Sequence, residues 1–299
     1  MEDRPDARTL VAVIVALVVW ASAFPGVRAL VDSRHPIFGP GQMALLRFLV
    51  ASAAFAVLAL ARRMRLPALR DVPRIALAAL CGITIYHLGF TFGESTVTAG
   101  AAALIIASGP IFTALLSIVF LGERLNAWGW GGVLLAFSGV TLIALGEGGG
   151  FSVERGALFV LMAAIGTAFY FVLSKGPLRV YGALEFTSYA VWFGTVPMLF
   201  FLPGLAAQVS SAPSWAIATI VYLGVFPGAV SYALWSYGLA RMPATKTASF
   251  LYAQPVLAAF IAWVWLREVP AWLTIAGGAI ALAGVVVVGT RGKAVTRRP

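Results

Sequence analysis

The sequence predicts an all-α integral membrane protein with ten transmembrane helices. Hydrophobic residues make up 61% of the 299 positions and charged residues only 11%, a balance far from that of soluble proteins. A bilayer core about 30 Å thick needs roughly 20 helical residues, and ten apolar segments meet this length. The segments lack the short apolar and polar alternation of a transmembrane β-barrel. A soluble fold is therefore disfavoured.

The ten spans follow one another with polar intervals too short to fold as separate domains. The first run is too long for a signal-peptide core and has no clear small-residue cleavage site, so we expect it to remain as a span. The fourth and ninth runs each contain a proline and end at an acidic residue. In chain order, the expected spans cover residues 10–30, 41–61, 74–93, 98–121, 129–146, 156–174, 184–202, 214–238, 245–266 and 271–290.

The positive charges of the chain predict its orientation. If the N-terminus is inside, sixteen of the 21 Lys and Arg residues lie on the inner side, and Arg47 lies within the second span. Only Arg28, Arg34, Arg155 and Arg267 lie outside. Because Lys and Arg are retained on the cytoplasmic side, both termini are predicted to be cytoplasmic. The net charge of +10 is scattered between apolar runs, so it does not indicate a nucleic-acid partner.

An internal repeat organises the chain. Pro110 and Pro255 are 145 residues apart, and Glu123 and Glu268 have the same separation. The offset also aligns Ala23-Phe24 with Ala168-Phe169, Gly93 with Gly238, Gly132 with Gly277, and Gly139-Val140 with Gly284-Val285. Each copy holds five spans, an odd number, so the second copy enters the membrane in the opposite sense. The sequence thus predicts two inverted five-helix repeats, residues 1–145 and 146–299.

Several of these features resemble a known family. They are Trp20-Ala21-Ser22-Ala23-Phe24 in the first helix, Arg47-Phe48 in the second, and the Pro-to-Glu helix with its Gly-rich successor in each half. Together they resemble the EamA-type, ten-helix branch of the drug/metabolite transporter superfamily over essentially the full chain. Within that branch the chain is most similar to the YddG-like exporters of aromatic amino acids. The resemblance implies export of small metabolites through a central cavity between the two repeats.

Polar-tipped aromatic residues lie inside the spans, although Trp and Tyr normally occupy the membrane interfaces. Packing or lipid contact is the alternative for any single one. Collectively they predict a cavity that covers a planar apolar group and hydrogen-bonds its polar end. The substrate-cavity candidates are Trp20, Phe24, Tyr86, His87, Phe90, Tyr170, Tyr232, Trp235, Ser249, Tyr252 and Gln254.

Ionisable residues at depth are few, and the cost of an intramembrane charge makes each a functional candidate. Arg47 is only about two turns inside its span, from where it could snorkel outward, and Glu94 and Lys246 lie near span ends. For His87 a neutral, packed state is the expected one. Because no pair of embedded carboxylates resembles a proton or sodium relay, a carrier without a coupled ion is favoured, with proton exchange as the alternative.

The repeated prolines and glutamates have mechanical interpretations. Pro110 and Pro255 are expected near the middle of their helices, where each lacks an N–H and crowds the carbonyl four residues earlier. They are hinge or gate candidates, with a static kink as the alternative. Glu123 and Glu268 are expected to bind backbone N–H groups or a basic side chain at the turn to the next helix, and a gate ion pair is the alternative. The four repeated glycines, Gly132, Gly139, Gly277 and Gly284, are interpreted as close-packing sites for the fifth and tenth helices.

The expected function is export of small neutral or zwitterionic metabolites, preferably amino acids including aromatic ones, by alternating access across the cell inner membrane. The sequence has no phosphate-binding Gly-rich loop, metal-ligand cluster or nucleophile motif, so we expect no cofactor, metal or enzymatic activity. The alternatives are a broad-specificity drug or nucleobase exporter and, from a different class, a channel or sensor. The expected partners are the substrate and the lipid bilayer, and both a monomer and a homodimer remain open.

Overall fold

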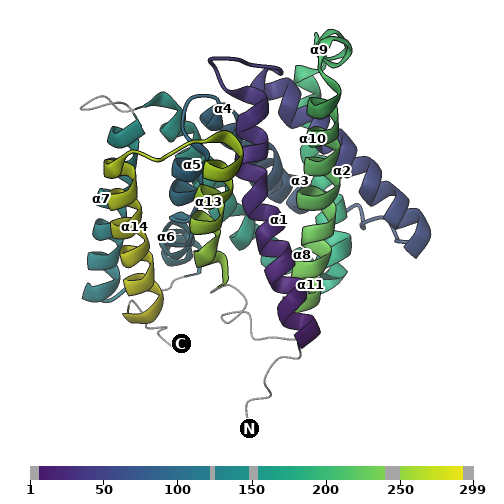
Figure 1. Cartoon of the computed structure of the whole chain (residues 1–299). Coiled ribbons are helices and arrows are strands. Elements are labelled where there is room, and N and C mark those ends of the chain that lie inside the picture. Colours follow the sequence, from purple (N-terminus) through teal and green to yellow (C-terminus); the bar gives the residue numbers. More distant parts are fainter. Residues whose placement is uncertain (1–6, 122–124, 148–153, 240–249, 292–299) are drawn as a thin grey trace, which may run out of the picture.

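The computed structural model describes residues 7–121, 125–147, 154–239 and 250–291, and every regular element in these ranges is helical (Figure 1). Glu123, Lys246 and Ser249 lie outside the described residues, as do the side chains of Pro110 and Tyr252. The elements of the first half are α1 (Ala7–Val31), α2 (Pro40–Arg62), α3 (Val72–Ala79), the π-helix η1 (Leu80–Ile85), α4 (Tyr86–Glu94), α5 (Ala99–Ile106), α6 (Gly109–Leu121) and α7 (Ala127–Glu147).

The second half begins with α8 (Arg155–Met198), which is interrupted at Gly182, where φ is 72°. Only glycine adopts this backbone conformation readily, so the residue separates two helical parts. The remaining elements are η2 (Leu199–Phe201), α9 (Leu205–Ser211), α10 (Ser214–Val225), the π-helix η3 (Phe226–Val230), α11 (Ser231–Leu239), η4 (Phe250–Ala253), α13 (Gln254–Leu266) and α14 (Trp272–Arg291).

The helices are those of a multi-pass membrane protein. Among the described residues, six segments are long and apolar enough to cross a bilayer, or seven if Leu184–Phe201 and Leu205–Ser211, bent by 88°, form one span. Large apolar side chains cover the outside of the bundle; Leu60 and Phe200, for example, are 81% and 82% exposed. A membrane solvates such a surface, whereas water does not. The six segments are Ala7–Val31, Pro40–Arg62, Val72–Glu94, Ala127–Glu147, Arg155–Ser174 and Ser214–Trp235.

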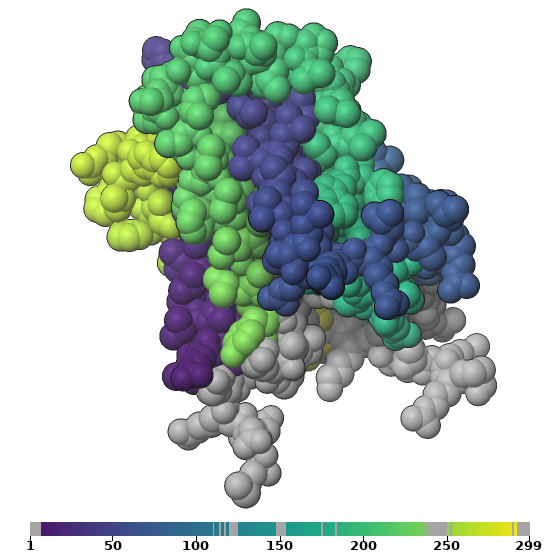
Figure 2. All heavy atoms as spheres, turned by 90° about the vertical axis from the view of Figure 1, so that its right-hand side faces the viewer, coloured from purple at the N-terminus to yellow at the C-terminus, as the bar shows by residue number. Residues whose placement is uncertain are grey.

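The two ends of the bundle are defined by α9 and by the chain ends. The first residues of α1 and the last residues of α14 lie at one end, and α9 lies at the other (Figure 1). Figure 2 shows α2 lying between α10 and the C-terminal part of α8, both of which it contacts. The backbone N–H of Gly39 donates to Oε1 of Gln208 at 2.9 Å, which fixes the start of α2 beside α9.

The expected fourth span is interrupted, because a turn at Ala107 and Ser108 separates α5 from α6. Pro110 is the second residue of α6, and Pro255 is the second residue of α13. Their expected position in the middle of a continuous helix is therefore wrong. A proline in the first turn removes an N–H that the helix does not use, so it starts a helix at no cost. Both the N–H and the hydroxyl of Ser108 donate to the carbonyl of Ile105, at 3.0 and 2.6 Å, and satisfy it at the break.

Element boundaries recur at the 145-residue separation. Helices α6 and α13 begin and end 145 residues apart, and so do the first residues of α7 and α14. The π-helices η1 and η3 end at Ile85 and Val230, again 145 residues apart. An uncommon element at equivalent places in both halves supports the two-repeat division that we propose below.

Helices α7 and α14 pack together through the four repeated glycines, as the sequence predicted. A Cβ atom on Gly139 would lie 2.3 Å from the backbone nitrogen of Ala281 and 2.5 Å from the carbonyl oxygen of Gly277. Gly132 and Gly284 approach each other in the same way. Backbones this close leave no room for a side chain, so these positions require glycine.

Candidate functional site

An aromatic cluster connects α1 with α11. The ring of Trp20 lies 5.2 Å from that of Tyr232 and 5.2 Å from that of Trp235, measured between centroids. Its indole N–H donates to the carbonyl oxygen of Pro227 in η3 at 3.0 Å. The polar end of Trp20 is thus satisfied inside the bundle, as a tryptophan away from the membrane interface requires.

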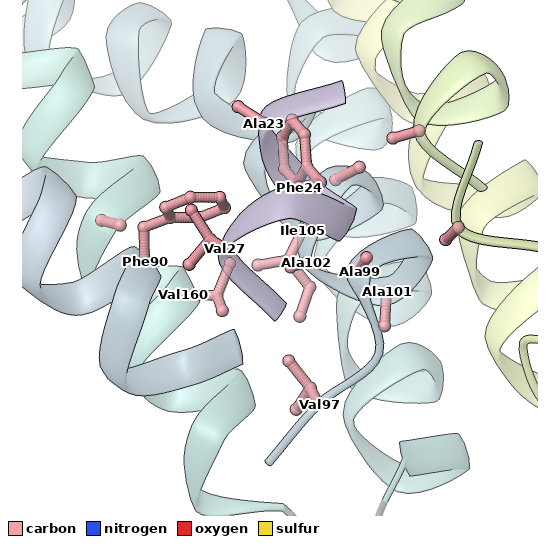
Figure 3. Close-up of a cluster of buried hydrophobic side chains, with 14 of the residues drawn as sticks. Ala23, Phe24, Val27, Phe90, Val97, Ala99, Ala101, Ala102, Ile105 and Val160 are labelled. Carbon is pink, nitrogen blue, oxygen red and sulfur yellow. The ribbon is translucent and has the colours of Figure 1, made fainter. Parts of the chain in front are cut away.

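The same cluster continues to α4. The rings of Phe24 and Phe90 meet edge to face at 5.1 Å, and Figure 3 shows them beside Val27 between α1 and α4. Tyr86 stacks on Phe90 with parallel rings 6.1 Å apart, and its edge faces His87 at 4.5 Å. Stacked and edge-to-face rings are the favoured aromatic geometries, so these side chains pack in a stable arrangement.

The two π-helices position the aromatic cluster. Tyr86 directly follows η1, and Tyr232 lies two residues after η3. The wider turn of a π-helix redirects the residues that follow it, and such segments are frequent at functional sites. Gly82 within η1 admits the ring of Tyr170 from α8, because a Cβ there would lie 2.3 Å from that ring. Tyr170 is also stacked on Phe186, with centroids 5.8 Å apart.

The structure brings most of the sequence-predicted cavity residues together. The ring contacts of Trp20 and Phe24 join α1 to α11 and α4, and Tyr170 of α8 lies against η1, which directly precedes α4. Gln254, half-buried, is the first residue of α13. The residues connected in this way are Trp20, Phe24, Tyr86, His87, Phe90, Tyr170, Tyr232 and Trp235.

Two charged residues at this cluster were absent from the predicted site. Arg47 of α2 is 4% exposed, and its charge interacts with Tyr86, Tyr232 and Glu94. Glu94, the last residue of α4, is 0% exposed. Sequence reasoning noticed both as ionisable groups in apolar spans but placed them near the interface. The signal that could have identified them is their location in segments otherwise without charge.

A recess of about 370 Å³ lies outside this cluster, toward the N-terminal end of α1. It is lined by exposed apolar side chains such as Val11 and Val15, so it belongs to the outer surface of the bundle. The aromatic cluster, in contrast, is packed ring against ring. Substrate could enter it only after these side chains or their helices move.

A hydrogen-bonded network around Glu268 joins the helices at the end of the bundle near α9, which we call the closed end. Its Oε1 accepts from Nε of Arg28 at 2.8 Å, and its Oε2 accepts from the backbone N–H of Ala99 at 3.1 Å. Nη1 of Arg28 donates to the backbone carbonyl of Glu94 at 2.7 Å. Glu268 thus binds a backbone N–H and a basic side chain, but its partners lie on α1 and at the start of α5 rather than in the adjacent turn.

Further contacts strengthen the same end. Glu147 accepts from the backbone N–H of Thr98 at 2.8 Å and from the hydroxyl of Thr274 at 2.9 Å. Burial raises the pKa of Asp32, but hydrogen bonds from Arg34 and the charges of Arg28 and Arg34 outweigh it and hold this pKa below its ordinary value. Asp32 therefore remains a carboxylate beside Arg28, at 3.5 Å.

Known proteins are similar to this chain in sequence. The model of the EamA-like transporter family matches residues 7–145 and again residues 154–290. The probable terminal-alkyne amino-acid exporter of Streptantibioticus cattleyicolor is 39% identical over 280 residues, covering 94% of this chain and 93% of that protein. The uncharacterized transporter YdfC of Bacillus subtilis is 38% identical over 267 residues, covering 89% and 86%.

A solved structure shows the same fold. The crystal structure of a protein with 21% sequence identity superimposes with a TM-score of 0.59, covering 95% of this chain and 97% of that one. The family match extends over both halves, and both relatives are named as transporters. This chain is therefore a multi-pass membrane transporter that belongs to the EamA-like transporter family.

Proposed function

We propose that this protein exports small metabolites, preferably amino acids including aromatic ones, across the cell inner membrane. Ten transmembrane helices form two inverted repeats, residues 1–145 and 146–299, with both termini in the cytoplasm. The observation that carries the proposal is the aromatic cluster of α1, α4 and α11 with buried charge beside it. Such a site covers a planar apolar group and offers polar contacts to its other end.

The relatives support the amino-acid class. The Streptantibioticus cattleyicolor protein is named as a probable amino-acid exporter, and its similarity to this chain extends over nearly the full length of both. An amino-acid head group is compact and carries both charges, which suits a site with a buried cation and a buried carboxylate.

Alternating access is supported by the network around Glu268. It joins the second half to α1 and α5 of the first half, so opening this end requires the two halves to separate there. Inverted repeats give two conformations of similar construction in which opposite ends open. Movement of one half against the other would expose the aromatic cluster first on one side and then on the other.

Transport assays with purified protein test the proposal. Liposomes carrying the protein and loaded with labelled phenylalanine or tryptophan should release label faster than protein-free liposomes. Trp20→Ala, Tyr86→Ala and Trp235→Ala should slow release, whereas Trp272→Ala, at a position 78% exposed on the outside of the bundle, should not. Release no faster than from protein-free liposomes would exclude these substrates.

Counterflow separates a carrier from a channel. Unlabelled phenylalanine inside the vesicles should accelerate uptake of labelled phenylalanine from outside. The reason is that a carrier opens its binding site to one face of the membrane and then to the other, and it exchanges one substrate molecule for another. A channel gives no such acceleration, and neither does a sensor. Absence of counterflow in vesicles that do release phenylalanine would contradict alternating access.

A further inference from the structure

We propose that Arg47 and Glu94 are the two poles of a site for the charged head of a zwitterionic substrate. Arg47 binds the carboxylate and Glu94 binds the ammonium group, so the transported class is the α-amino acids rather than amines or acids with one charge. This inference rests on the proposed export function and adds the residues that select the substrate.

The first observation is the state of Arg47. Its Nε and Nη1 are buried without a hydrogen-bond partner among the described residues. The ring of Phe48 lies 5.7 Å from the guanidinium carbon, so part of its surroundings is aromatic. A buried guanidinium without a carboxylate is costly, and Arg is suited to bidentate carboxylate binding. A bound carboxylate removes that cost.

The second observation is the state of Glu94. Neither of its carboxylate oxygens has a hydrogen-bond partner in the described part of the chain, although both are buried. The charged groups that act on it are Arg28, Glu268 and Arg47. Arg28 is already bound by Glu268 and by the backbone carbonyl of Glu94 itself. The Glu94 carboxylate is thus left without a binding partner among the described residues.

The relation between the two residues points to the ligand. No hydrogen bond joins them among the described residues, because Nε and Nη1 of Arg47 and both carboxylate oxygens of Glu94 lack partners there, although the two side chains are near enough to influence each other electrostatically. A molecule with one charge would satisfy one residue and leave the other buried and unpaired. The head of an α-amino acid carries a carboxylate and an ammonium on one carbon, and it satisfies both at once.

The repeat indicates how the substrate is oriented. At the 145-residue offset, Arg47 corresponds to Trp192 and Glu94 to Leu239, so both charged positions have apolar counterparts in the second half. Aromatic residues can occupy equivalent positions in both halves, since Phe90 corresponds to Trp235. The charged head therefore binds against the first half, and the side chain of the substrate points toward the aromatic rings of α1 and α11.

The test compares three ligands in counterflow. Phenylalanine carries both charges, phenethylamine lacks the carboxylate, and 3-phenylpropionate lacks the ammonium group. A hydrogen-bonded charge contributes about 1.5–3 kcal/mol, so each analogue should compete at least about tenfold more weakly than phenylalanine for the wild-type protein.

Two variants should then give opposite patterns. Arg47→Gln should weaken competition by phenylalanine by about tenfold or more. Phenylalanine should then compete no better than phenethylamine. In Glu94→Gln, phenylalanine should compete no better than 3-phenylpropionate. Arg62→Gln is the same substitution at an exposed position in the last turn of α2, and in this variant all three ligands should compete as they do in the wild type.

Each outcome decides the inference. Equal competition by all three ligands in the wild type, or a parallel loss of all three in folded variants, would overturn it, because the two residues would then be structural. If a variant does not fold, the wild-type series with the three ligands decides alone. Wild-type vesicles that neither release nor exchange phenylalanine refute the proposed export of aromatic amino acids and this inference together. Exchange without discrimination refutes only the inference.

Discussion

Arg28 connects three parts of the chain through one side chain. It lies near the end of α1, binds Glu268 after α13, and donates to the last residue of α4. A planar guanidinium with several N–H groups can make these contacts at once, which a lysine ammonium does less well. Arg28 therefore joins α1, α4 and the residues after α13 at this end of the bundle.

Glu268→Gln is expected to destabilise the protein. Breaking a buried ion pair costs about 3–5 kcal/mol, and Asp32 beside Arg28 reduces this cost. The melting temperature of the purified protein in detergent should fall clearly. Arg34→Gln, in which a 69% exposed side chain loses its ion pair, should change it little. Equal melting temperatures for the two variants would show that the Glu268 network does not hold the bundle closed.

The residue types of the site could be predicted from the sequence, but their pairing could not. Trp20, Tyr86 and Tyr232 are recognisable because polar-tipped aromatics are unusual in the middle of apolar spans. Arg47 and Glu94 were recognisable as charges, but their burial depends on how α2 and α4 pack. That packing is set by contacts far apart in the sequence, which no local pattern records.

At the scale of elements, helix interruptions position the site. The π-helices η1 and η3 precede Tyr86 and Tyr232, and α5 is separated from α6 at Ala107. The sequence located the proline-containing segments correctly but predicted kinks in place of new helix starts. The sequence did not show that a two-residue turn at Ala107 and Ser108 ends α5 before the proline, with Ser108 donating to the carbonyl of Ile105.

The α7 and α14 pair offers a direct test of close packing. In Gly139→Ala the new methyl group would lie 2.3 Å from the backbone nitrogen of Ala281, so the helices must separate. Such overpacking costs about 1–3 kcal/mol and should lower the melting temperature. Gly131→Ala, where no atom lies within 4 Å of the new methyl group, is the matched control. It should leave the melting temperature unchanged or raise it, because alanine favours a helix more than glycine. Equal effects of the two changes would contradict the packing of α7 against α14.

At the scale of the whole molecule, two similar halves carry different chemistry. Among the described residues, the buried charges Arg28, Arg47 and Glu94 all belong to the first half, and Glu268 is the second half's contribution to the closed end. When the charged side chains belong to one half, a nearly symmetric protein can bind an asymmetric substrate in one orientation. The repeated outline was visible in the sequence, whereas the contact between Glu268 and α5 was not, because it crosses from one half to the other.

The orientation of the molecule in the membrane can be tested at its two ends. Ser210 lies in α9 on the closed end, which we propose faces away from the cytoplasm. Leu69, 88% exposed, follows α2, whose 23 residues extend about 35 Å from the α9 end toward the other. After Cys81→Ala removes the native thiol, Ser210→Cys should react with a membrane-impermeant maleimide in intact spheroplasts. Leu69→Cys should react only after the membrane is permeabilised, because the positive residues that follow α2 are retained inside. The Cys81→Ala protein without a new cysteine gives the background. The reverse pattern of labelling would place the termini outside and make the closed end the cytoplasmic one.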